Sequence, residues 1–110
     1  SEMENLCSLY AGIPADLPEV RAAGLHHAFT QIHPFQDGNG RVARALASLD
    51  FIRARLFPLL VRREDKLAGY VPALEKADNG NLAPLVDFFT VSMTRVLTRA
   101  ISEAEGAVAS

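Results

Sequence analysis

"IHPFQDGNGRVAR", residues 32–44, is the stretch that organises this chain. It contains a histidine, an aspartate, an asparagine between two glycines, and two arginines. A proline disfavours helical geometry at the residue before it, so Pro34 predicts that a helix ends at His33. The glycines indicate a loop, and a new helix should begin at Asn39 or Gly40. The stretch therefore predicts two helices joined by a short polar loop.

Apolar residues on both sides of this loop recur with the spacing of helices, and the period-2 alternation of strands is essentially absent. We therefore predict an all-α fold in which the motif loop and a helix N-terminus form an anion site. Residues 11–18 should form a loop, residues 56–61 a buried connection and residues 106–110 a fraying tail. Pro72 should kink one helix, and Asn81 should cap the last one. The predicted helices cover residues 3–10, 19–32, 39–55, 64–78 and 82–105.

Length and composition suit a single small domain. Of the 110 residues, 49% are hydrophobic and 22% are charged, so we expect a folded core rather than disorder. The net charge of −2 argues against a broad nucleic-acid surface, so any anion site must be local. Cys7 is the only cysteine, which excludes an internal disulfide and a thiolate metal cluster. No apolar run is long enough to span a membrane, and the first residues lack the pattern of a signal peptide.

The helix that follows the loop has the features of an anion site at its start. The first backbone N–H groups of a helix lack intrahelical partners and lie at the positive end of the helix dipole. Gly38 and Gly40 allow a ligand to approach these donors closely. Arg41 and Arg44 are three residues apart and so share a helical face. Two arginines beside a helix N-terminus suit a polyphosphate better than a single phosphate.

Asp37 and His33 add a metal ligand and a base. A carboxylate would repel a bound phosphate unless a cation lay between them, and Mg²⁺ binds one or two carboxylates together with phosphate oxygens. Histidine exchanges protons near neutral pH, so His33 suits acceptance of a proton from an incoming hydroxyl. All these residues together are explained by one function, a site for nucleotide-phosphate transfer.

Each residue also has a plainer interpretation. His33 could stabilise a helix C-terminus, and Asp37 could be the N-cap of the next helix. Arg41 and Arg44 could be solvated surface charges. The plainer account needs a separate explanation for each residue, whereas the functional account needs one.

"HPFQDGNGRVAR" resembles the signature of the Fic domain family, His-Pro-Phe-x-Asp/Glu-Gly-Asn-Gly-Arg-x-x-Arg, at every fixed position from His33 to Arg44. "AGLHHAFTQIHPF" resembles the helix that precedes the family motif, and "YVPALEKADNGNLAPLVDFF" resembles the later helices. The resemblance covers most of residues 19–90 and implies a compact Fic-like helical bundle. It also implies that residues 1–110 are a single Fic-like core domain, a fragment of a longer chain that lacks the β-hairpin flap of the family.

The resemblance implies protein AMPylation, in which an enzyme transfers AMP from ATP to a Tyr, Ser or Thr hydroxyl of a target protein and releases pyrophosphate. Matched by position, His33 would be the general base for the target hydroxyl. Asp37 would hold Mg²⁺ or Mn²⁺ at the phosphates. Phe35 would anchor the loop in the core without taking part in the chemistry.

The same match assigns the ATP phosphates to the residues after Asp37. Backbone donors at Gly38, Asn39 and Gly40 would form the anion cradle, with help from the Asn39 side chain. Arg41 would bind the inner phosphates and Arg44 the γ-phosphate.

Four positions outside the motif need comment. Tyr70 is followed by Val71 instead of a second aromatic residue, and its spacing to "ADNG" is shifted by one residue from the family pattern. Tyr70 could stack on adenine or lie in the core. Asp78 stands where the family often has an asparagine near the base. We interpret His26 as a packing or supporting residue, and His27 as exposed.

Other functions remain open. Fic-type phosphoryl or other nucleotidyl transfer is one, although Gly40 stands where the kinase-like branch tends to carry lysine. A non-catalytic ATP-binding interaction module is another. A helical DNA-binding domain is a third, against which Asp37 and the net charge count. The family's inhibitory helix has Ser or Thr four residues before a glutamate, and no glutamate here has this; Ser102 is three before Glu105.

The expected partners are ATP, a target protein of unknown identity, and an inhibitory helix or antitoxin-like partner. We expect no nucleic acid and no membrane among them. The expected location is the cytoplasm, with secretion as an effector as the alternative.

Overall fold

The computed structural model describes residues 4–5, 8 and 17–109. Within this part of the chain the structure is helical and contains no strand, which confirms the all-α prediction. The predictions for residues 3–10 and 11–16 lie almost wholly outside the described residues. The elements are α2 (Pro18–Ile32), α3 (Asn39–Arg53), α4 (Arg63–Asp65), the π-helix η1 (Lys66–Tyr70), α5 (Val71–Asp78) and α6 (Ala83–Ala109).

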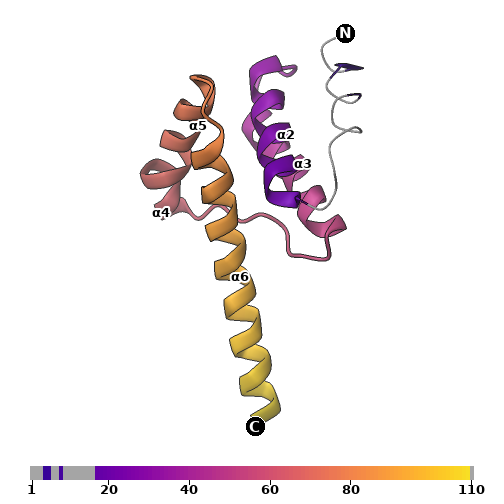
Figure 1. Cartoon of the computed structure of the whole chain (residues 1–110), viewed down its shortest axis with the longest axis vertical. Coiled ribbons are helices and arrows are strands. Elements are labelled where there is room, and N and C mark those ends of the chain that lie inside the picture. The colour runs from indigo at the N-terminus through magenta and orange to yellow at the C-terminus, as the bar shows by residue number, and fades with distance from the viewer. Residues whose placement is uncertain (1–3, 6–7, 9–16, 110) are drawn as a thin grey trace.

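The long helix α6 runs through the middle of the molecule in Figure 1, with α2 and α3 on one side and α4 and α5 on the other. The principal extents are 55 × 30 × 25 Å, and the long dimension follows α6, whose C-terminal half projects beyond the other helices (Figure 1). The segment between α3 and α4 crosses the base of the bundle. This arrangement leaves the turn from α2 to α3 at the end of the molecule remote from the C-terminus.

Two clusters of buried residues hold the helices together. Leu25 and Phe29 of α2 pack with Ala43 of α3 directly beneath the motif loop. In the larger cluster the biggest fully buried side chains include Phe51 of α3 and Phe89 of α6, whose ring centroids are 6.3 Å apart. Buried alanines on α2 and α3 let these helices approach closely; they are Ala22, Ala23, Ala43 and Ala47.

The predicted helix over residues 64–78 is interrupted, as Pro72 indicated, but the interruption is a π-helix. η1 spans the five residues Lys66–Tyr70, and Pro72 falls in the first turn of α5, where the missing N–H of a proline is tolerated. A π turn contains one residue more than an α turn. Tyr70, the last residue of η1, is buried in the core.

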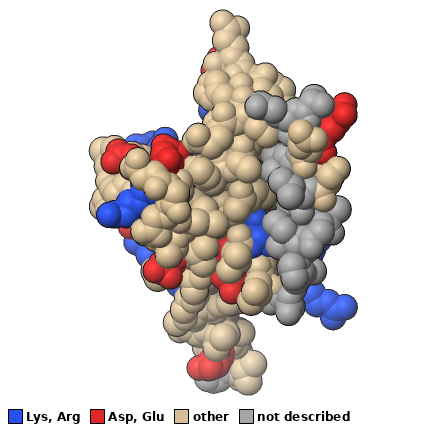
Figure 2. All heavy atoms as spheres, turned by 45° about the horizontal axis from the view of Figure 1, so that its top comes forward, with Lys and Arg blue, Asp and Glu red and all other residues tan. Residues whose placement is uncertain are grey.

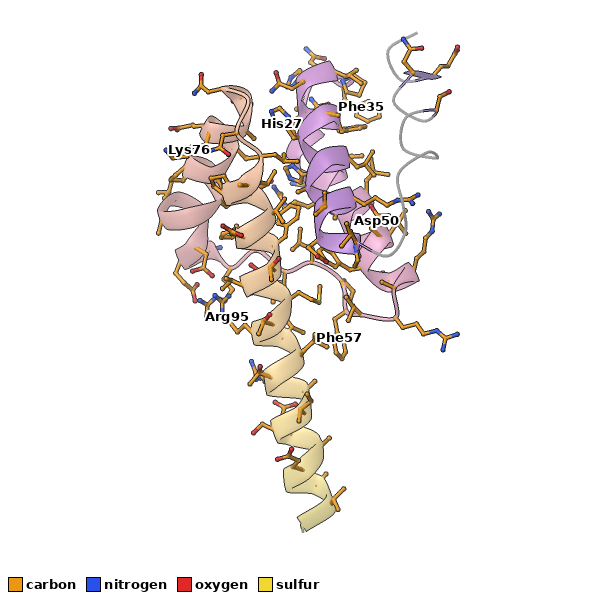
Figure 3. All side chains as sticks on the ribbon, viewed as in Figure 1. His27, Phe35, Asp50, Phe57, Lys76 and Arg95 are labelled. Atoms are coloured by element: carbon orange, nitrogen blue, oxygen red, sulfur yellow. The ribbon has the colours of Figure 1, made fainter. Side chains whose placement is uncertain are left out.

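Two expectations for irregular segments are wrong. Phe57 and Leu60 are 42% and 59% exposed, whereas Leu56, Leu59 and Val61 pack against the core, so the connection over residues 56–61 is only partly buried. The chain lies along the surface here, and only some of its side chains turn inward. Phe57 projects below the bundle in Figure 3.

The tail over residues 106–109 is helical, because α6 continues to Ala109. At the other end of this helix, the Oδ1 atom of Asn81 accepts a hydrogen bond from the N–H of Ala83 at 3.3 Å, as the predicted capping role requires.

Candidate active site

His33 lies where α2 ends and adopts a left-handed backbone conformation. Its φ and ψ are 52° and 57°, and its N–H donates to the Phe29 carbonyl at 3.0 Å. Pro34 disfavours continuation of the helix, and the left-handed residue turns the chain away from the α2 axis. A non-glycine residue in this conformation carries about 1 kcal/mol of backbone strain, and such strain is concentrated at functional sites. The His33 side chain is exposed at this turn.

Asn39 holds the loop in shape. Its Oδ1 accepts a hydrogen bond from the Phe35 N–H at 3.1 Å, and its Nδ2 donates to the Phe35 carbonyl at 2.8 Å. The Asn39 side chain is buried and thus serves the loop rather than lying open to a ligand. The expectation that Phe35 anchors the loop in the core is wrong, because this side chain is 52% exposed and only approaches Phe29, at 6.2 Å between ring centroids. Figure 3 places Phe35 at the outer end of the α2–α3 pair.

Replacing Asn39 with alanine should lower the free energy of unfolding by about 1–3 kcal/mol, because both polar atoms of the Phe35 backbone lose their buried partner. Chemical denaturation with an unchanged m-value measures this loss. Asn79→Ala is the matched control, since the Nδ2 of Asn79 also donates to a backbone carbonyl, that of Glu75, but at the surface. An equal loss in the two variants would contradict the role of Asn39.

The first turn of α3 presents open backbone donors. Gly38 is the N-cap, with φ 78°, and no side chain caps the helix. The first backbone bond of this turn runs from the Val42 N–H to the Gly38 carbonyl at 3.0 Å, so the N–H groups of residues 39–41 have no partner among the described residues. The plainer interpretation of Asp37 as an N-cap is wrong; its side chain is exposed beside these donors. A helix start of this kind is an anion site.

Arg44 reaches back toward the start of α3. A Cβ atom placed on Gly40 would lie 3.2 Å from the Nη1 of Arg44, so the guanidinium lies over the first turn in the space that the glycine leaves. Arg44 is half-buried and its Nη1 donates to the Tyr70 hydroxyl at 3.3 Å. Arg41 is exposed on the same stretch of helix. The two arginines therefore differ: Arg44 is held within the protein, and Arg41 extends into solvent.

Comparison with known proteins shows which family this chain is similar to. The Fic/DOC family model matches residues 1–49, which contain the whole motif. The chain is 39% identical over 67 residues to protein adenylyltransferase Fic from Nematostella vectensis, covering 61% of this chain and 16% of that protein. It is 34% identical over 80 residues to protein adenylyltransferase Fic from Aedes aegypti, covering 73% of this chain and 16% of that protein.

The chain belongs to the Fic/DOC family. The structure of Fic-1 from Caenorhabditis elegans superposes with a TM-score of 0.78 and 33% sequence identity, over 82% of this chain and 27% of that one. The chain thus corresponds to a small part of these relatives, about a sixth of the length of the two adenylyltransferases. The shared part is the helical body that carries the motif.

Tyr70 of this Fic domain lies in the core. It is 3% exposed, and the His26 Nε2 lies 2.5 Å from its hydroxyl. Its ring packs against Phe88 at 5.7 Å between centroids, and the Arg44 Cζ lies 5.7 Å from its ring centroid. Of the two interpretations of Tyr70, the structure favours the core residue, since no open ring face is left for an adenine to stack on.

His26 is fully buried, as its place in the apolar stripe of α2 indicated. Burial, together with the positive charge of Arg44, lowers the pKa of His26 from 6.5 to about 4. Burial also raises the pKa of the Tyr70 hydroxyl, although the hydrogen bond from Arg44 opposes that change. His26 is therefore neutral at physiological pH, and Arg44 is the only cation of this group.

Asp78 of this Fic domain ties α5 to α2 at the surface. Its Oδ1 accepts from the Gln31 Nε2 at 2.8 Å and lies 3.0 Å from the His27 Nε2 (His27 is labelled in Figure 3). His27 is half-buried by this contact, not simply exposed as expected. The spacing of His27 and Gln31 along one helical face was the only sequence signal for this contact.

The described residues contain no group of three or more His, Cys, Asp or Glu side chains that could hold a metal ion, and none of their helices is long and apolar enough to cross a membrane. Figure 2 shows acidic and basic side chains in small separate groups on one face of the molecule, without a continuous basic area.

Proposed function

We propose that this Fic domain is the catalytic core of a protein adenylyltransferase. In the reaction the oxygen of a Tyr, Ser or Thr hydroxyl on a target protein attacks the α-phosphorus of ATP. The bond from this phosphorus to the oxygen bridging the β-phosphate breaks, and pyrophosphate leaves. The relatives' activity supports this proposal, and one observation on the structure carries it. The exposed side chains of His33 and Asp37 come directly before the uncapped start of α3. Arg44 is folded over Gly40 at the same helix start.

His33 is the proposed general base. Its side chain is exposed and has no hydrogen bond to any described residue, so its imidazole is available to the acceptor hydroxyl. The left-handed backbone fixes the direction in which the side chain leaves the end of α2. Phosphoryl-type transfer depends mainly on positioning and charge neutralisation, and one group that accepts the hydroxyl proton completes the site.

The start of α3 is the proposed cradle for the ATP phosphates. The backbone N–H groups of Asn39, Gly40 and Arg41 supply donors, and the absence of a side chain at Gly38 keeps the approach open. The Arg41 side chain, which extends into solvent, suits the inner phosphates, and Arg44 suits the γ-phosphate. The Asn39 side chain is left out of the cradle, because both of its polar atoms are bonded to Phe35.

Asp37 is the proposed protein ligand of Mg²⁺ or Mn²⁺ that arrives with ATP. A single exposed carboxylate fits such an ion, since Mg²⁺ bound to a nucleotide takes most of its ligands from phosphate oxygens and water. The donor set does not suit an ion held by the protein alone. When bound, the metal would neutralise phosphate charge, and it would also relieve the repulsion between Asp37 and the phosphates.

Arg44 is also the residue through which an inhibitor could regulate ATP binding. Only one of its guanidinium donors is used by Tyr70, so the γ-phosphate takes part of the remainder. A glutamate from an inhibitory helix or an antitoxin-like partner would compete for the same donors. We place the protein in the cytoplasm, where ATP is available, or in a target cell that it enters as an effector.

The label position distinguishes this function from phosphoryl transfer. We expect the full-length protein, incubated with Mg²⁺ and a lysate as a source of targets, to transfer label from α-labelled ATP and none from γ-labelled ATP. Chelation of the metal should stop the transfer. Transfer from γ-labelled ATP would instead establish a kinase-like reaction, and binding of ATP without either transfer would support an interaction module.

A further inference from the structure

Behind the proposed phosphate site lies a chain of three polar side chains from three different elements. His26 comes from α2, Tyr70 from η1 and Arg44 from α3. The Tyr70 hydroxyl is 2.5 Å from the His26 Nε2 and 3.3 Å from the Arg44 Nη1. His26 is fully buried and Tyr70 is 3% exposed, whereas Arg44 is half-buried. The chain thus runs from the core outward to the first turn of α3.

The hydrogen atoms that link His26, Tyr70 and Arg44 have one favourable arrangement. An arginine only donates, so Tyr70 accepts from Arg44, and its own hydroxyl hydrogen is then free to donate to the His26 Nε2. This requires the tautomer of His26 that carries its hydrogen on Nδ1. That atom has no partner among the described residues. The other tautomer would leave both this nitrogen and the Tyr70 hydroxyl hydrogen without a partner, which is the worse outcome.

Tyr70 is held firmly from several sides. Its ring meets the His26 ring edge-on at 5.5 Å between centroids and packs against Phe88 at 5.7 Å. His26 is in turn packed edge-on against Phe89 of α6, also at 5.5 Å. The charged or titratable groups around His26 are Arg44, Tyr70 and His27; α6 contributes only an aromatic ring there. The surroundings therefore favour a neutral His26 and a fixed Tyr70.

These contacts restrict the side chain of Arg44. A free arginine has many rotamers, and ordering them on binding weakens affinity. Here one guanidinium nitrogen is bonded to a buried hydroxyl, and the guanidinium lies in the space above Gly40. We propose that His26 and Tyr70 are positioning residues that hold Arg44 in place for the outer phosphates of ATP before ATP arrives. This inference rests on the proposed nucleotide site.

Tyr70→Phe tests the proposal in the full-length protein, since it removes only the hydroxyl and keeps the ring. The expected result is about a tenfold loss of ATP affinity with no change in AMP affinity, because AMP lacks the outer phosphates. Ser48→Ala is the matched control. It also removes a hydroxyl hydrogen bond from α3, here with the Leu59 N–H at 2.9 Å, and should leave ATP affinity unchanged.

Equal losses of ATP and AMP affinity in Tyr70→Phe would overturn the proposal, since they would reveal a general structural effect. Unchanged ATP affinity would overturn it as well. A readout that needs no nucleotide is the ¹⁵N relaxation of the Arg44 Nε–H, whose motion should increase in Tyr70→Phe; unchanged motion would overturn the positioning role. If the wild-type protein binds no ATP, the proposed function fails, while the relaxation measurement still decides whether Tyr70 holds Arg44.

Discussion

Replacing His33 with asparagine should reduce AMP transfer by about 10²–10⁴-fold while ATP affinity stays near that of the wild type. Asparagine is chosen because His33 has a φ of 52°, a left-handed conformation that asparagine tolerates far better than alanine. The variant therefore removes the proposed base without adding strain at the turn. Single-turnover transfer from α-labelled ATP measures the rate, and calorimetric titration measures ATP affinity.

His33→Ala should lose a similar amount of activity, but alanine keeps the left-handed strain at the turn, so His33→Asn should be the more stable of the two variants by about 1 kcal/mol. His27→Asn is the matched control, since it makes the same change on the same helix, at a residue whose side chain pairs with Asp78 at the surface. Its transfer rate should equal that of the wild type. Transfer at the wild-type rate in His33→Asn would contradict the assignment of the base.

The motif helices were predictable because short-range rules decide them. Pro34 acts sterically on His33, and α2 ends at Ile32, one residue before it. Gly38 provides the positive φ at which α3 begins, and the helix starts at Asn39, as predicted. Neither rule depends on the rest of the fold. The family resemblance extended these local rules to a function, but only for the residues of the motif.

The contacts behind the motif were not predictable in the same way. His26, Arg44 and Tyr70 are far apart in sequence, and no local rule predicted the π-helix that ends at the buried Tyr70. The sequence also did not show that Asn39, and not Phe35, anchors the motif loop, because either residue could have anchored a loop of this length. A histidine within an apolar stripe did signal a buried polar group that needs a partner, but the sequence did not identify that partner.

The buried His26 should make folding stability depend on pH. The pKa of His26 falls from 6.5 to about 4 in the folded protein, so the folded state resists protonation that the unfolded chain accepts. The contribution of His26 to the free energy of unfolding is fully present above about pH 6.5. It is lost as the pH falls toward 4, because in that range the unfolded state binds more protons than the folded state. The shift corresponds to about 3 kcal/mol of unfolding free energy between pH 7 and pH 4.

Urea denaturation of the wild type and of His26→Gln, each at pH 7 and at pH 4, isolates the contribution of His26 to stability. Glutamine does not titrate and retains groups that can bond the Tyr70 hydroxyl, so His26→Gln should lose about 3 kcal/mol less than the wild type on acidification. Carboxylates elsewhere affect both proteins equally and cancel in the difference. If the substitution prevents folding, an NMR titration of His26 in the wild type replaces it. A midpoint near 6.5, or an equal loss of stability in both proteins, would mean that His26 is not held neutral in the core, and the ordered hydrogen bonds from His26 to Arg44 would lose their support.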